Sequence, residues 1–280
     1  MQTVQTGESL YAMQLRDVGM ADSAELTLTQ LKYKCQGIVN TTAVVSARDS
    51  YLSWVEEADR HFRSVFSDDI MADDLYTPAY WEIRRIVQAT PRPYPLIRGE
   101  IENQVRRIDA ALVQISRARD FASQPGTVVV TDTSAFIQGE IFTDFAWPTK
   151  MGIKGSVRLV VPIIVVEQLD ELKDTGHTTA GDKARKVLKR FREKHRAAGQ
   201  VFPAPVRDKV TIEVLLDDDK HQRLPIADDE IIRQALKVQQ MVPGDVMLAC
   251  VDASMEFRAL AKGLKVFEVP PSPRSIQSTS

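Results

Sequence analysis

Short runs of β-branched and apolar residues alternate with helical patterns through the second half of this chain, and this alternation limits the folds open to it. The runs cover residues 127–131, 157–166, 210–216, 246–251 and, more briefly, 264–267. Helical patterns lie between them, at residues 167–173, 180–197, 227–241 and 253–262. Strands that alternate with helices form βαβ units, whose strands pair in parallel. We therefore predict an α/β domain built on a parallel sheet.

The residues before position 126 follow a helical period instead. Apolar positions recur on one helical face from Ser50 onward, and Ser50 is placed to cap that helix. Thr77 followed by Pro78 predicts a second helix start, because threonine caps well and proline suits the first helical position. Prolines at 91, 93 and 95 are expected to break the chain before a longer helix.

The longer helix carries a heptad seam. Its apolar residues are spaced 4, 3, 4 and 3 apart: Ile101, Val105, Ile108, Leu112 and Ile115. The seam lasts about two heptads, which is shorter than the three or four that indicate a coiled coil. We expect it to pack against the other N-terminal helices, and a homodimer contact is the alternative.

Proline and glycine punctuate residues 122–126, which we interpret as a linker. We therefore expect a helical domain at 1–125 and the α/β domain at 126–270. Residues 271–280 are rich in proline and serine, so we expect a disordered tail there.

The composition excludes several classes of protein. With 44% hydrophobic and 26% charged residues, the chain is expected to pack a core. The formal net charge is −2, so any nucleic-acid surface must be local. Cys35 and Cys250 provide no disulfide framework, which suits a reducing compartment. The sequence shows neither a secretory signal nor an apolar stretch of about 20 residues. We expect a cytoplasmic protein without membrane contact.

Carboxylates gather at one edge of the predicted sheet. Asp132 and Asp252 follow predicted strands, Asp228 and Asp229 open a helix, and Glu167 follows the second strand. Ligands of open parallel sheets bind beyond the carboxyl ends of the strands. Clustered carboxylates repel one another, and a hard divalent cation offsets that repulsion. Such an ion can assist phosphodiester hydrolysis. The alternative is ordinary capping, in which Asp228 caps its helix.

Four segments, in this order, resemble the motifs of the PIN domain ribonuclease family. They are VVVTDTSAF at 128–136, VPIIVVEQLDELK at 161–173, ADDEII at 227–232 with Ala235, and VMLACVD at 246–252 with Met255, Arg258, Ala259, Ala261 and Gly263. The resemblance covers about half of the chain and is closer to the larger PIN class than to the compact toxins.

This resemblance implies a three-layer α/β/α sandwich with a parallel sheet, an endonuclease activity on single-stranded RNA, and magnesium or manganese at the acidic centre. Asp132, Asp229 and Asp252 fall on the family's metal-site aspartates, and Asp228 accompanies Asp229. Ser134 falls on the small polar position that supports the first aspartate.

The second motif departs from the family, because its usual glutamate falls on Gln168. Glutamine offers a neutral oxygen, so metal affinity is expected to drop. Glu167 lies one residue earlier, and a local bulge could bring it into the site, so we include it among the catalytic candidates. Glu171 is a weaker substitute on the face of Gln168. Cys250 also replaces a threonine of the family. The alternative function is therefore a weak or inactive PIN domain that acts as an RNA-binding or protein-interaction scaffold.

Residues 183–196 carry eight lysines and arginines and one glutamate. Such a stripe is typical of contact with a phosphate backbone, and a solvated helix face is the alternative. Ala184-Arg185-Lys186 resembles a basic element of the larger PIN class. We predict RNA contacts at Arg185, Lys186, Lys189 and Arg190.

Three other classes fit less well. A phosphoryl-transfer enzyme commonly needs a second aspartate where this chain has Ser134. A metal-free ribonuclease needs paired histidines, but His61, His177, His195 and His221 are scattered, and we interpret them as surface or loop residues. A toxin of a toxin–antitoxin pair is a small single domain, which the long helical region disfavours.

Overall fold

The structure is a computed structural model, and it describes residues 21–66, 69–176, 178–199, 203–217 and 221–272. These residues form two compact units, which divide between Ala122 and Ser123. Most of the predicted tail, residues 273–280, lies outside the described residues. None of the helices in the described part of the chain combines the length and apolar character that a bilayer crossing requires.

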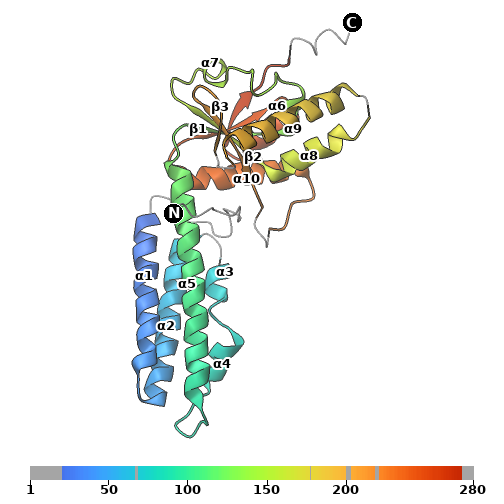
Figure 1. Ribbon diagram of the computed structural model, residues 1–280. Coiled ribbons are helices and arrows are strands. Elements are labelled where there is room, and N and C mark those ends of the chain that lie inside the picture. The colour runs from blue at the N-terminus through green and yellow to red at the C-terminus, as the bar shows by residue number, and fades with distance from the viewer. Residues whose placement is uncertain (1–20, 67–68, 177, 200–202, 218–220, 273–280) are drawn as a thin grey trace. The chain divides into compact units, whose positions relative to one another are not determined.

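The first unit is helical. Its elements are α1 (Ala21–Gly37), η2 (Ile38–Asn40), α2 (Val44–Val65), α3 (Ile70–Asp73), α4 (Pro78–Arg84) and α5 (Pro93–Ser123). The three long helices α1, α2 and α5 lie side by side (Figure 1). The indole of Trp54 donates to Leu31 O at 2.9 Å and joins α2 to α1. Lys32 and Asp109, 2.7 Å apart, join α1 to α5.

Two of the predicted helix starts are wrong and one is confirmed. The second helix begins at Val44, after Ala43, so Ser50 lies inside it and caps nothing. The fifth helix begins at Pro93 rather than after the prolines, because the first-turn N–H groups have no acceptor within a helix and proline costs little there. Thr77 does cap α4, since its hydroxyl accepts from Tyr80 N at 3.0 Å.

The buried face of α5 differs from the predicted seam. Val105 and Leu112 are partly exposed, whereas Gln104 and Ala111 are buried. Gln104 is tolerated inside because its amide donates to Glu100 Oε1 at 2.6 Å and to Leu75 O at 3.2 Å. A pattern of apolar residues cannot reveal such a bonded glutamine. The homodimer contact stays a prediction.

The second unit holds a six-stranded sheet. Its strands are β1 (Thr127–Thr131), β2 (Val157–Pro162), β3 (Ala204–Arg207), β4 (Val210–Leu215), β5 (Val246–Cys250) and β6 (Lys265–Glu268), in the order β3-β4-β2-β1-β5-β6. Its helices are α6 (Thr133–Ile137), α7 (Trp147–Lys150), α8 (Ile163–Lys173), α9 (Thr179–Ala197), α10 (Ala227–Met241) and α11 (Ala253–Ala261).

The sheet is mixed rather than purely parallel. Five strands pair in parallel, and β3 runs antiparallel to β4. A two-residue turn with Lys209 at φ 57° connects β3 to β4, and such a short connection permits only antiparallel pairing. The sequence did not predict β3, because it is four residues long and contains Pro205, which an edge strand tolerates.

The central strands are buried on both faces. In β1 and β2 nearly every residue is buried, which requires helices on both sides of the sheet. Figure 1 shows α9 and α10 on different sides of these strands. The unit is therefore an α/β fold with covered faces, as predicted.

The predicted strand at 157–166 is divided in two by the structure. Strand β2 ends at Pro162, and α8 begins at Ile163. An apolar run does not distinguish a buried strand from a buried helix, which explains the error. Glu167 and Gln168 consequently lie in the second turn of a helix and not at a strand end.

The order of the strands reverses at β1. The chain passes from β1 to β2 and β4 on one side, and then returns to place β5 on the other side. Ligands of such sheets bind at this switch point, beyond the carboxyl ends of the strands. Asp132 N donates to Ala249 O at 2.9 Å, so the ends of β1 and β5 are in register.

A buried ion pair joins β2 to β4. The guanidinium of Arg158 donates to the carboxylate of Glu213, and these side chains are 1% and 6% exposed. Burial raises the pKa of Glu213, and Arg158 opposes this rise.

Replacing Glu213 by alanine should destabilise the α/β unit by about 3–5 kcal/mol, because the buried Arg158 charge loses its carboxylate. Urea denaturation followed by circular dichroism would measure the loss. Lys265→Ala is the control, since its pair with Asp245 is exposed and should contribute at most about 1 kcal/mol. Equal losses in the two variants would contradict this account.

Candidate functional site

Asp132 directly follows β1 and caps α6. Its Oδ1 accepts from Thr133 N at 2.6 Å, and its Oδ2 accepts from Ser134 N at 3.2 Å. Asp132 is 6% exposed. Burial raises the pKa of Asp132; hydrogen bonds from Ser134 and Thr133 oppose the rise, and the Asp228 carboxylate adds to it. The negative charge of Asp228 thus disfavours the ionised form of Asp132.

Ser134 fixes this aspartate to the neighbouring strand end. Its hydroxyl donates to Asp132 Oδ2 at 2.5 Å and accepts from Val251 N at 3.0 Å. The structure thus places Ser134 between the ends of β1 and β5, beside the aspartate that it was predicted to support.

Gln168 reaches the same place from α8. The hydroxyl of Thr133 donates to Gln168 Oε1, so the amide lies beside the residue that follows Asp132. Glu167 faces elsewhere, because adjacent helix residues point about 100° apart. It accepts two hydrogen bonds from Arg223, one of them at 3.0 Å, and α8 continues through it without a bulge. Helix α8 therefore brings a neutral amide to Thr133, and its neighbouring carboxylate is already paired.

Asp228 and Asp229 lie in the first turn of α10. Ile226 occupies the N-cap position of this helix without a side-chain hydrogen bond, so the alternative in which Asp228 is the cap is wrong. Arg258 of α11 lies 3.7 Å from Asp228 Oδ2 and 3.4 Å from Asp229 Oδ1. We did not predict a role for this arginine at the site. Nothing in the sequence around Arg258 indicates which carboxylates it contacts in the fold.

Asp252 follows β5 by two residues and caps α11, where its Oδ1 accepts from Ser254 N at 2.9 Å. Cys250 ends β5, and burial raises the pKa of its thiol to about 12, with further contributions from Asp132 and Asp252 among others. The cysteine is therefore a neutral, buried group beside two of the predicted ligands.

Five of the predicted site residues form two groups, and Asp252 belongs to neither of them. Asp132, Ser134 and Gln168 are joined through hydrogen bonds at the end of β1, and Asp228 and Asp229 share Arg258. All of the atoms that these side chains could offer to a metal are oxygens, the type of ligand that magnesium and manganese prefer. The donor set therefore fits such an ion, whose charge would offset the repulsion between Asp132 and Asp228.

A tighter group lies elsewhere. Among the described residues, Asp217, His221 and Glu230 form the group of three whose ligand-type atoms lie within 4.8 Å of one another. The prediction that His221 is a surface or loop side chain is wrong in part, because its side chain is 4% exposed. It lies 2.7 Å from Glu230 Oε1.

Both carboxylate oxygens of Glu230 in this group already accept hydrogen bonds. Gln234 donates to Glu230 Oε1 at 2.8 Å, and Arg233 and the Leu224 N–H donate to Oε2 at 2.6 and 2.9 Å. Burial acts to raise the pKa of Glu230, but these hydrogen bonds and that from His221 hold it below its ordinary value. The group fastens the segment before α10 to that helix, and a cation would have to displace several of these donors.

The four predicted RNA contacts differ in their surroundings. Arg185 donates to Lys173 O, Gly176 O and Asp182 Oδ1, so it closes the turn between α8 and α9. Lys186, Lys189 and Arg190 are exposed. Glu193 lies 3.1 Å from Arg190 and 4.0 Å from Lys189.

Comparison with known proteins supplies an independent finding. A family model described as "PIN domain" matches residues 129–269, which is half of the chain. The search of curated proteins found no match. A solved structure, a domain of a functionally unknown protein from Methanocaldococcus jannaschii DSM 2661, is similar at 16% identity and a TM-score of 0.35. That likeness covers 52% of this chain and 94% of the other.

Replacing Arg258 by glutamine should strengthen the binding of Mn²⁺. The change removes a positive charge beside Asp228 and Asp229 that a divalent cation would have to displace. Arg258 is partly exposed, so we expect about 1 kcal/mol, or roughly a fivefold lower Kd.

Isothermal titration calorimetry would measure this affinity. Lys262→Gln removes the same charge just beyond the end of α11 and should leave the affinity unchanged. Weaker binding by the Arg258 variant would mean that this arginine holds the site together.

Proposed function

Because this chain belongs to the PIN domain family, we propose that its α/β unit is a metal-dependent endoribonuclease that cuts single-stranded RNA. Members of this family are usually nucleases, and nucleases are hydrolases of phosphodiester bonds. The observation that carries the proposal is Asp132, a buried carboxylate fixed at the point where the strand order reverses. Hydrogen bonds from Thr133 and Ser134 offset part of the cost of burying this charge, and a cation bound at the switch point would offset more of it.

Asp132, Asp228, Asp229 and Asp252 would hold a magnesium or manganese ion. When bound, the ion would lower the pKa of a water molecule and polarise the scissile phosphate. Thr133 N and Ser134 orient Asp132, and Ser134 also holds it against the end of β5. Asp252 is oriented by Ser254 N. These hydrogen bonds fix two of the four carboxylates before any ligand binds.

A second function is favoured by the contacts of α8. Gln168 brings no charge to the site, and Glu167 is paired with Arg223. A site with one acidic ligand fewer would hold its ion less tightly. The alternative is therefore a weak or inactive PIN domain that serves as an RNA-binding or protein-interaction scaffold.

The first experiment incubates the full chain with labelled single-stranded RNA and Mn²⁺. Cleavage is expected for the wild type, and Asp132→Asn should reduce its rate at least about 100-fold. Loss of a residue that merely orients a metal ligand lowers activity about 10- to 100-fold, and loss of the ligand itself should lower it at least as much. EDTA should abolish the cleavage. Gel electrophoresis of the products measures the rate.

Two controls define the result. Asp245→Asn removes an exposed carboxylate whose pair is Lys265, away from the strand ends that carry the site, and should cut at the wild-type rate. A wild type that binds RNA without cutting it would support the scaffold instead.

Gln168→Glu should raise both Mn²⁺ affinity and the cleavage rate several-fold. The change restores a charge without altering the length of the side chain, and Thr133 can donate to a carboxylate as it does to the amide. Calorimetry and the cleavage assay measure the two effects. If neither quantity changes, this position of α8 does not contact the ion.

A further inference from the structure

Helix α9 presents two basic faces. Lys186 and Arg190 lie four residues apart on one of them. Lys189, Arg192 and Arg196 follow one another at spacings of three and four on the other. The two faces carry similar charge, so the sequence alone does not distinguish them.

The second face borders a cavity of about 330 Å³, formed with the end of α8. Its lining residues are Lys173, Arg185, Leu188, Lys189, Arg192, Glu193 and Arg196. Five of these seven residues carry a positive charge and one carries a negative charge. Lys186 and Arg190 do not line it. We call this cavity the α8–α9 pocket.

Local contacts hold the walls of the α8–α9 pocket. Arg185 fixes the end of α8 by donating to Lys173 O. Asp170 lies 2.5 Å from the Lys173 ammonium and 3.9 Å from the Arg192 guanidinium, so one carboxylate faces two cations. The Lys189 ammonium lies 4.0 Å from the Glu193 carboxylate. The walls of the pocket therefore carry more positive than negative charge.

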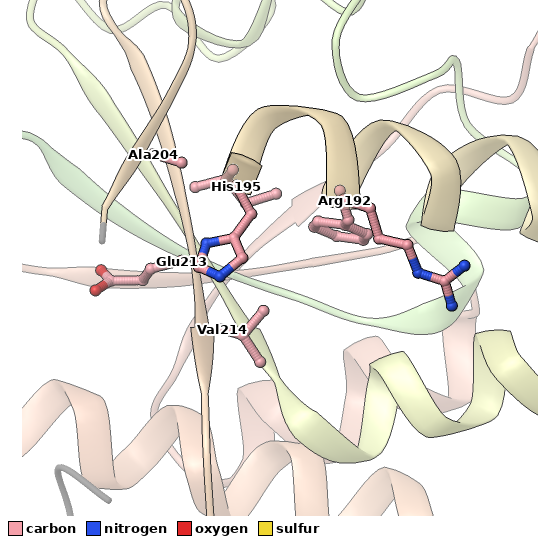
Figure 2. A pocket seen from close by; sticks show the side chains of 7 residues that line it. Arg192, His195, Ala204, Glu213 and Val214 are labelled. Atoms are coloured by element: carbon pink, nitrogen blue, oxygen red, sulfur yellow. The ribbon is translucent and has the colours of Figure 1, made fainter. Parts of the chain in front are cut away.

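Arg192 stands between this pocket and a second, smaller one. Its stem helps to line an apolar cavity of about 170 Å³ with Phe191, His195, Ala204, Ile212, Glu213 and Val214. Figure 2 shows its guanidinium directed away from the Glu213 carboxylate. The Arg192 side chain thus borders this cavity, and 63% of the whole side chain is exposed. Its planar guanidinium is pre-organised, so it loses less conformational entropy for each hydrogen bond that it forms with an anion.

We propose that the α8–α9 pocket binds one phosphate-bearing nucleotide of a single-stranded RNA. This inference rests on the proposed function, whose substrate it positions. The volume falls at the lower end of the range for small-ligand sites, which suits a single nucleotide. Guanidinium groups match phosphate oxygens in pairs and also stack on unpaired bases. Leu188 supplies an apolar wall for a base or a ribose.

The pocket also lies near the candidate site along one rigid element. Lys173 ends α8, and Gln168 of the same helix accepts from Thr133 beside Asp132. Five residues of helix span about 8 Å along the axis. A strand held at the pocket would therefore be anchored a short distance from the carboxylates.

The test compares two variants that each remove two charges from the α/β unit. Arg192→Gln with Arg196→Gln alters the pocket, and Lys150→Gln with Lys154→Gln alters two exposed lysines that precede β2. Glutamine keeps most of each stem, and circular dichroism would verify that both variants fold. Fluorescence anisotropy with a labelled single-stranded RNA, in EDTA so that the RNA stays intact, measures the affinity of the full chain at several salt concentrations.

The pocket variant should bind about tenfold more weakly, and its slope of log K against log salt should shrink by about 1.4, which corresponds to two phosphate contacts. The control variant should stay within about twofold of the wild type. Equal weakening of both variants would overturn the proposal, since a diffuse basic surface would then bind the RNA. Displacement of the RNA by poly-glutamate of equal charge would also overturn it, because the pocket would then take any acidic chain.

These readouts are independent of cleavage. If RNA binds through the pocket but is not cut in Mn²⁺, the proposed nuclease activity is wrong and the proposed pocket stands. If the wild type cuts RNA but the pocket variant binds it as tightly as the wild type does, the proposed pocket is wrong and the nuclease activity stands.

Discussion

The hydroxyl of Ser134 connects the two strand ends on which the candidate site depends. It donates to Asp132 after β1 and accepts from Val251 N after β5. Because the backbone amide that it binds belongs to the neighbouring strand segment, the orientation of Asp132 is coupled to the packing of the sheet. Every other candidate ligand is placed relative to this fixed carboxylate, by α10 or by the start of α11.

Much of the α/β unit could be predicted from its sequence, because strand and helix periods are local properties. Helix α10 has the predicted limits, and Asp132 and Asp252 follow strands as expected. The errors have physical causes. Pro162 divides one apolar run into a strand and a helix, and β3 is too short to show a period. The partners of Glu167 and Asp228 are arginines far along the chain, and no local pattern encodes such pairs.

The charge balance of the candidate site follows from these arginines. Arg223 pairs with Glu167, and Arg258 of α11 lies close to the two aspartates of α10. Without a metal, the protein's own cations thus neutralise part of the acidic cluster. These pairs leave fewer negative charges available to an ion than the sequence alone suggests, in addition to the charge that Gln168 lacks. An arginine in such a place lowers the cost of holding carboxylates together and competes with a metal for them.

The short strand β3 has a consequence for the behaviour of the whole sheet. An exposed strand edge can recruit a strand from another molecule, and this is a common start of aggregation. Strand β3 is four residues long, and Pro205 within it has no N–H that could donate to an added strand. At the opposite edge, Lys265 and Glu268 of β6 place charges at the solvent. These two edges should disfavour edge-to-edge pairing between copies of this chain at high concentration.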